Sequence, residues 1–166
     1  MKKLTTKQIA LNGILAGLYA AVTILTSSFA YGNIQFRLAD SLCLLTALEP
    51  SLAVGISLGC LIANLFSTVT ALDIFVGTAA TLLGCLLTAK IRKTALVPLP
   101  TLLSNTLLVG AMLAFCYAPE AFRRGFILFG AEIALGQAVV LYALGVPLYL
   151  LAKKTALIEK LLAEKS

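Results

Sequence analysis

The chain contains a stretch of 29 residues, from Gln8 to Phe36, without a charged side chain. Three lysines, Lys2, Lys3 and Lys7, stand before it. A helix needs about 20 apolar residues to cross a bilayer, so the stretch is long enough to span a membrane. The apolar region of a secretory signal peptide is shorter, at about 7–15 residues. We therefore interpret residues 7–29 as a first membrane-spanning helix.

The composition extends this interpretation to the whole chain of 166 residues. Hydrophobic residues make up 60% and charged residues 12%, whereas soluble domains are usually about half apolar and about a quarter charged. A soluble globule could not cover its surface with so few polar groups, and a disordered chain needs many more charges. The composition therefore predicts an integral membrane protein. Six spans would take roughly 120 residues and leave little chain for a motor domain.

Charges and prolines divide the rest of the chain into helices. Glu49-Pro50 and Pro119-Glu120 fit helix starts, because Pro is tolerated in a first turn and acidic side chains are stabilised there. Gly145 and Pro147 should bend the last helix, since Pro removes a backbone hydrogen bond. The predicted fold is an all-α bundle of six transmembrane helices over 1–154, followed by an amphipathic tail over 155–166. The six helices are expected at about 7–29, 37–48, 50–67, 72–91, 99–118 and 119–152.

The basic residues indicate how the six predicted spans are oriented. With six spans both chain ends lie on one side of the membrane, and that side carries ten of the 13 lysines and arginines. The other side carries Arg37, Arg123 and Arg124. Because membrane proteins concentrate Lys and Arg in cytoplasmic segments, we expect both termini in the cytoplasm. We expect no nucleic-acid partner, since the basic residues form short clusters between apolar runs.

Several features that enzymes require are missing. The chain has no histidine, the commonest general base and a common metal ligand. It has no Gly-rich loop followed by Lys and Ser or Thr, so we expect no ATP hydrolysis by this chain. Its acidic residues do not form the cluster of a metal-dependent enzyme, and its four cysteines are expected to be small buried hydrophobes. We predict a protein that is not an enzyme and uses no cofactor or metal.

Polar side chains collect in the outer half of the predicted bundle. Interfacial solvation or an interhelical hydrogen bond explains each one equally well, but together they favour a binding site. Glu132 is the hardest to explain by solvation, because it lies about 18 Å below the outer end of the last helix at 1.5 Å per residue. A buried carboxylate needs a partner, which a ligand or Arg37 could provide. The candidate binding residues are Asn33, Gln35, Phe36, Arg37, Asp40, Asn64, Asp73, Asn105, Glu132 and Gln137.

Small residues line one side of the first predicted helix. Gly13 and Gly17 are four residues apart, and so are Ala16 and Ala20. This spacing lets a second helix approach closely. The second helix could belong to the same chain or to a partner subunit. We take Gly13, Ala16, Gly17 and Ala20 as candidate docking residues.

Several segments resemble the QueT family. The run Tyr31-Gly-Asn-Ile-Gln-Phe-Arg-Leu-Ala-Asp40 is similar to its signature Tyr-Gly-x-Ile-Gln-Phe-Arg-x-(Ser/Ala)-(Glu/Asp). Asp40 stands where the family often has Glu, and Gln137 stands where an acidic residue is frequent. The likeness covers about residues 7–152. The other similar residues are 59–65, Asp73, 77–83, Leu99-Pro100 with Asn105, and Gly136-Gln137 followed by 144–148.

The resemblance implies a fold and partners. QueT proteins are regarded as substrate-binding S components of energy-coupling factor (ECF) transporters for queuosine precursors. S components resemble one another in having six helices, cytoplasmic termini and a pocket near the outer face, covered by the loop after the first helix. The resemblance thus implies a multi-pass protein of the bacterial cell membrane, with a transmembrane coupling subunit and two ATPase subunits as partners. Ala16 and Ala20 match the Ala-x-x-x-Ala motif through which such a first helix docks.

The substrate that the resemblance implies is a 7-deazaguanine, such as queuine or its aminomethyl precursor. A carboxylate can accept hydrogen bonds from the ring N–H and the exocyclic amine, and a side-chain amide supplies a donor and acceptors. Arg37 is available for the ring carbonyl or for holding a carboxylate. Phe36, Tyr31 and Phe129 are candidates for stacking on the base.

Depth in the predicted bundle ranks the carboxylates as Glu132, then Asp40, then Asp73. Three alternative functions remain open. The chain could be an S component for another vitamin, such as a flavin or thiamine. It could be an independent small membrane carrier or channel, or a membrane scaffold without a ligand. Stable association with an ATPase module would favour an S component, whereas uptake by the chain alone would favour a carrier.

Overall fold

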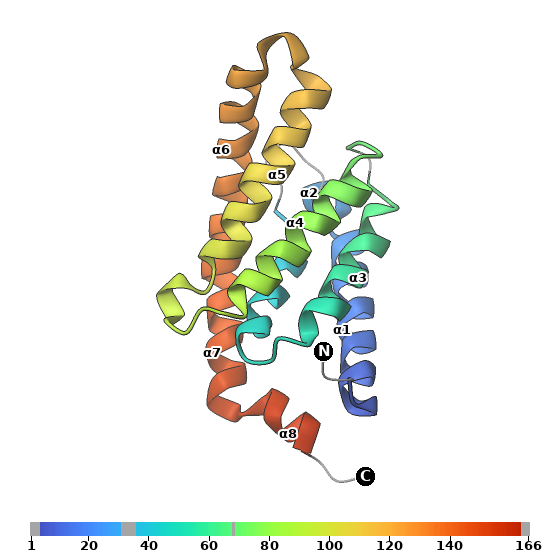
Figure 1. Cartoon of the computed structure of the whole chain (residues 1–166), viewed down its shortest axis with the longest axis vertical. Helices are drawn as coiled ribbons and strands as arrows, with labels where there is room; N and C mark the ends of the chain where they lie inside the picture. Colours follow the sequence, from blue (N-terminus) through green and yellow to red (C-terminus); the bar gives the residue numbers. More distant parts are fainter. Residues whose placement is uncertain (1–3, 31–35, 68, 164–166) are drawn as a thin grey trace.

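A computed structural model describes residues 4–30, 36–67 and 69–163. Every regular element within these ranges is helical, which agrees with the predicted all-α fold class (Figure 1). The elements are α1 Thr6–Leu25, α2 Ser27–Ala30, η1 Leu38–Ala47, α3 Leu52–Asn64, α4 Asp73–Thr88, η2 Thr94–Leu96, α5 Leu99–Tyr117, η3 Pro119–Ala121, α6 Phe122–Val140, η4 Leu141–Gly145, α7 Val146–Thr155 and α8 Leu157–Ala163.

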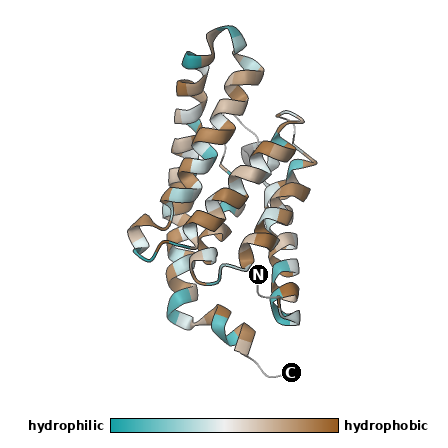
Figure 2. Ribbon diagram, in the orientation of Figure 1, coloured by the Kyte–Doolittle hydropathy of each residue, from teal (hydrophilic) through white to brown (hydrophobic). Residues whose placement is uncertain are grey.

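The outer surface of the bundle is apolar. Leu25 is 85% exposed and Phe75 is 73% exposed, and Figure 2 shows hydrophobic residues along the outer faces of the helices. Soluble monomers rarely expose apolar patches of this extent, so the surface suits a membrane protein. Among the described residues, three segments are long and apolar enough to cross a bilayer, and three shorter apolar helices accompany them. The long segments are Thr6–Leu25, Thr94–Tyr117 and Pro119–Thr155, and the shorter helices are η1, α3 and α4.

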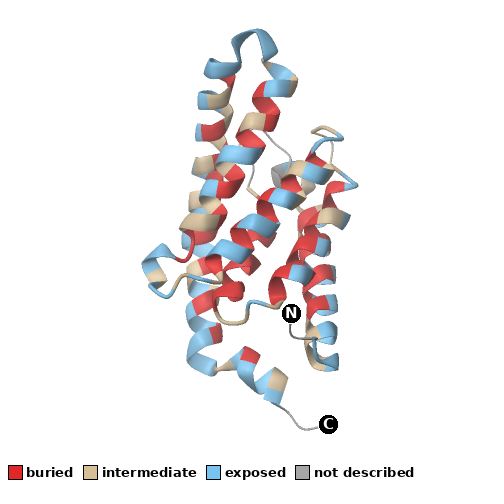
Figure 3. Ribbon diagram, viewed as in Figure 1, coloured by how far each residue is buried: buried red, intermediate tan, exposed pale blue. Residues whose placement is uncertain are grey.

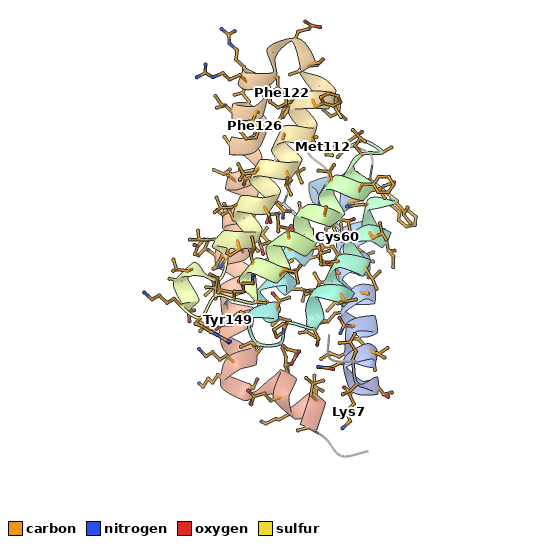
Figure 4. The ribbon with its side chains drawn as sticks, viewed as in Figure 1. Lys7, Cys60, Met112, Phe122, Phe126 and Tyr149 are labelled. Atoms are coloured by element: carbon orange, nitrogen blue, oxygen red, sulfur yellow. The ribbon has the colours of Figure 1, made fainter. Side chains whose placement is uncertain are left out.

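Consecutive long helices run in alternating directions along the bundle (Figure 1). The start of α1 and the C-terminal helix α8 lie at the lower end of the view, where Ile158 of α8 belongs to the same buried cluster as Leu15 of α1. The connection between α5 and α6 lies at the opposite end. Figure 4 shows the same separation, with Lys7 at the lower end and Phe122 at the upper end.

Two glycines of α3 allow this helix to pack closely against α1. A Cβ atom added to Gly55 of α3 would overlap the backbone oxygen of Asn12 in α1, and one added to Gly59 would lie 2.6 Å from the backbone oxygen of Ala16. Small residues four apart on α3 therefore seat that helix against α1. Buried residues accordingly line the inward faces of the helices and exposed residues the outward faces (Figure 3).

Two of the expected helices differ in kind from the prediction. The helix expected over 7–29 is interrupted after Leu25, where the Thr26 hydroxyl donates to the Val22 carbonyl and competes with the helical hydrogen bonds. The short helix expected over 37–48 is a 3₁₀ helix, Leu38–Ala47. Because a 3₁₀ helix rises about 2 Å per residue, these ten residues extend further through the bundle than an α-helix of the same length.

The last expected helix, 119–152, is divided into η3, α6, η4 and α7. The π-helical turn η4 ends two residues before Pro147, which lacks the N–H that a continuous α-helix would need. A π turn thus interrupts the α-helix at this point, and the predicted bend at Gly145 and Pro147 stays a prediction. Helix α3 covers 52–64 instead of the expected 50–67, and α4 covers 73–88 instead of 72–91. The expected tail contains α8, which follows Ala156 in a left-handed backbone conformation with φ of 50°.

Candidate functional site

Asp40 lies at the start of η1 with no exposed surface and accepts hydrogen bonds from three side chains. The Tyr19 hydroxyl of α1 donates to Oδ1. The amides of Asn105 in α5 and Gln137 in α6 both donate to Oδ2, over 3.2 and 2.5 Å. One carboxylate thus joins residues from α1, η1, α5 and α6. We call Tyr19, Asp40, Asn105 and Gln137 the Asp40 cluster.

The 3₁₀ geometry of η1 explains why Arg37 and Asp40 enter the same region. Residues three apart eclipse each other along a 3₁₀ helix, and the Asp40 N–H donates to the Arg37 carbonyl over 2.9 Å. Asn105 and Gln137 reach this region because they lie on the buried faces of their helices, with exposures of 2% and 1%. Local geometry and helical periodicity therefore bring the polar residues together.

Arg37 anchors a second buried network. Its side chain is 2% exposed, and its Nη2 donates to Asn64 Oδ1 over 2.5 Å and lies 3.4 Å from Cys60 Sγ. The Asn64 amide donates in turn to the Asp73 carbonyl over 2.9 Å. We call Arg37, Cys60, Asn64 and Asp73 the Arg37 cluster. The labelled Cys60 places this cluster near the middle of the molecule in Figure 4.

Asp73 is the first residue of α4, and its side chain lies against Gly77, one turn later in the same helix. The Ser67 hydroxyl donates to Asp73 Oδ2 over 2.9 Å. A Cβ atom added to Gly77 would overlap Asp73 Oδ1 and lie 2.9 Å from Asn64 Nδ2. Gly77 is therefore required here for space, because any larger residue would displace both side chains.

The two clusters are incompletely paired. Among the described residues, four of their buried polar atoms have no hydrogen-bond partner: Arg37 Nε, Asp73 Oδ1, Asn105 Oδ1 and Gln137 Oε1. A buried polar atom without a partner costs about 1–3 kcal/mol. One unpaired donor and three unpaired acceptors suit a small polar ligand that carries more donors than acceptors.

Residues 9–154 match the family described as QueT transporter. The chain belongs to the QueT transporter family. It is 33% identical over 99 residues to the protein named "Queuosine precursor transporter QueT" of Lactococcus lactis subsp. cremoris (strain MG1363). That match covers 56% of this chain and 58% of the relative, so it spans little more than half the length of the QueT relative. No solved structure matches the chain.

Six of the ten binding residues predicted by the QueT resemblance and by polarity lie in the two clusters. Of the others, Asn33 and Gln35 lie outside the described residues. Phe36 is half-buried just before η1. Glu132 is half-buried and forms no hydrogen bond or ion pair with the described part of the chain. The six that come together are Arg37, Asp40, Asn64, Asp73, Asn105 and Gln137.

Two cluster members were not predicted, and the aromatic candidate Phe129 lies elsewhere. Tyr19 and Cys60 look like ordinary apolar-span residues in the sequence. A buried Tyr hydroxyl needs a partner, and this requirement was the available signal for Tyr19. The stacking candidate Phe129 packs beside the ring of Tyr117, with centroids 6.3 Å apart, and Tyr31 lies outside the described residues.

The four candidate docking residues of α1 occupy two environments. Ala16 and Ala20 are 8% and 6% exposed, and the Ala16 backbone meets Gly59 of α3. Gly13 and Gly17 are exposed, and a Cβ atom added to either would meet nothing within 4 Å. Packing within the chain therefore accounts for Ala16, while Gly13 and Gly17 present an open face.

Proposed function

We propose that the chain is the substrate-binding S component of an ATP-driven ECF importer for queuosine precursors, 7-deazaguanines such as queuine or its aminomethyl precursor. It captures substrate from outside the cell without chemistry. The observation that carries the proposal is the pair of buried, incompletely paired polar clusters inside an apolar bundle of the QueT transporter family. The name of the Lactococcus relative supports the substrate class.

The unpaired atoms favour a guanine-like base over other vitamins. The edge of such a base carries two N–H donors beside one carbonyl acceptor. Asn105 Oδ1 and Gln137 Oε1 complement the donors, and Arg37 Nε complements the carbonyl. The corresponding edge of a flavin carries one N–H donor between two carbonyl acceptors, so it has more acceptors than donors. The aminopyrimidine of thiamine has no carbonyl for Arg37.

The membrane orientation and docking belong to the same proposal. We propose six crossings of the bacterial cell membrane with both termini in the cytoplasm. The alternating helix directions and the position of Lys7 at the end shared with α8 support this orientation (Figures 1 and 4). The bundle docks on a transmembrane coupling subunit carried by two ATPases, and the open Gly13 and Gly17 face of α1 is the surface available for it.

The test is the thermal stability of the purified chain in detergent with queuine, its aminomethyl precursor, riboflavin and thiamine. A ligand present at 100 times its dissociation constant should stabilise the fold by about 2.7 kcal/mol. We expect stabilisation by the two deazaguanines alone. Stabilisation by riboflavin or thiamine would contradict the substrate class, and uptake by the chain in vesicles without an ATPase module would contradict the S-component role.

A further inference from the structure

We propose that the amide oxygens of Asn105 and Gln137 bind the N–H groups of the ligand, and that Asp40 positions these amides without contacting the ligand itself. The identity of the ligand rests on the proposed function. The division of roles rests on the hydrogen bonds of the Asp40 cluster. It reassigns the recognition of the base from a carboxylate to two neutral side chains.

Both oxygens of Asp40 are already engaged by the protein. Oδ1 accepts from the Tyr19 hydroxyl, and Oδ2 accepts from both the Asn105 and the Gln137 amide. The protein therefore fills three of the about four acceptor positions of this carboxylate, which leaves it little capacity for a ligand. Asp40 has no exposed surface.

The carboxylate determines which end of each amide faces the site. An ionised carboxylate only accepts hydrogen bonds, whereas a side-chain amide has a donating nitrogen and an accepting oxygen. The nitrogens of Asn105 and Gln137 therefore face Asp40, and their oxygens are directed elsewhere. Among the described residues neither oxygen has a partner, although the side chains are only 2% and 1% exposed. Two buried acceptors thus remain for a ligand.

The two amides are neighbours, because both nitrogens bond to the same carboxylate oxygen. One small planar ligand can therefore meet both. A ligand with two N–H groups on one edge can donate to both amide oxygens. A ligand with a carbonyl or an unprotonated ring nitrogen in place of one N–H group leaves one amide oxygen unpaired. A site built around such bonds rejects analogues that lack a donor. We infer selectivity for bases that carry both a ring N–H and an exocyclic amine.

The experiment compares the affinities of 7-deazaguanine and 7-deazahypoxanthine, which lacks the exocyclic amine, by calorimetry on the purified full chain. The wild type should bind 7-deazaguanine about 10- to 100-fold more tightly. Asn105→Leu or Gln137→Met removes one acceptor, and the variant that loses the partner of the amine should bind both bases within about threefold of each other. The wild-type comparison needs no variant, so it stands even if a substitution impairs folding.

Two substitutions of Asp40 separate positioning from direct contact. In Asp40→Asn the new oxygen can accept from both amides while its nitrogen donates to the Tyr19 hydroxyl, so the affinity should fall by no more than about tenfold. Asp40→Leu releases both amides and should lower affinity at least about 100-fold.

The outcomes that would overturn the proposal differ from a failure of the proposed function. Loss of binding in Asp40→Asn with retention in Gln137→Met would show that the carboxylate itself contacts the ligand. Equal discrimination between the two bases in wild type and both amide variants would show that the amides are only structural. Binding of neither base by the wild type would overturn the proposed function, and the assignment of the amides with it.

Discussion

Asn12 and Asn105 are both buried asparagines on long apolar helices, and they differ in how they are paired. The Asn12 amide accepts from the Gly55 N–H over 2.6 Å and donates to the Gln8 carbonyl over 2.7 Å. Asn105 uses only its nitrogen, on Asp40, and its oxygen is unpaired among the described residues. The first residue satisfies the backbone at a helix contact. The second has an unpaired acceptor oxygen, which we propose is available to a ligand.

The contrast extends to the surroundings of the two residues. Asn12 lies where the glycines of α3 bring two backbones together, and Ser104 and Thr101 form a comparable paired contact between α4 and α5. Asn105 donates to the buried carboxylate of Asp40, which lies three residues after the buried Arg37. We infer that the fully paired side-chain amide holds helices together, whereas the buried amide with an unpaired oxygen belongs to the proposed ligand site.

The largest effect is expected from Asp40→Ala. The substitution leaves the Tyr19 hydroxyl and two amides without their acceptor, so it should cost about 3 kcal/mol or more of stability and lower ligand affinity at least about 100-fold. Thermal unfolding and calorimetry measure the two quantities. A variant that bound ligand normally would show that the cluster lies outside the site.

A smaller effect, on stability alone, is expected from Gly55→Ala. The added Cβ overlaps the Asn12 backbone and should separate α1 from α3, at a cost of about 1–3 kcal/mol. Gly13→Ala on the facing helix is the matched control, because its Cβ meets nothing within 4 Å. Equal melting temperatures of the two variants would contradict the packing described for α3.

The smallest effect is expected from Asn12→Leu. Interhelical hydrogen bonds inside membranes contribute about 0.6 kcal/mol on average, so the melting temperature should fall only slightly. Ligand affinity should stay within about twofold of the wild type, because Asn12 belongs to the paired contacts. A large loss of affinity would place Asn12 in the binding machinery and remove the distinction between the two asparagines.

Much of the fold follows from the order of charges and prolines. The start of α5 at Leu99, beside Pro98 and Pro100, and the tail helix α8 agree with the residues that predicted them. The 3₁₀ geometry of Leu38–Ala47 and the interruption after Leu25 were missed. Both depend on tertiary packing and on single side-chain hydrogen bonds, which hydrophobic periodicity does not report.

The candidate site was predictable as a set of residues but not as an arrangement. Polar residues inside apolar spans indicated Arg37, Asp40, Asn105 and Gln137. Depth along a helix favoured Glu132 as the ligand-binding carboxylate, and that ranking stays a prediction; the geometry favours the Asp40 cluster instead. The depth of a residue in the membrane depends only on its position along its own helix. Pairing depends on which helices are neighbours and on which face each residue lies.

The most direct measurement is the dissociation constant of 7-deazaguanine for Asn105→Leu and Asn12→Leu, together with their ligand-free melting temperatures. We predict that Asn105→Leu loses about 10- to 100-fold in affinity, while Asn12→Leu keeps its affinity within about twofold and lowers the melting temperature only slightly. Similar affinities for both variants would contradict this prediction, because paired and unpaired asparagines would then serve the same purpose.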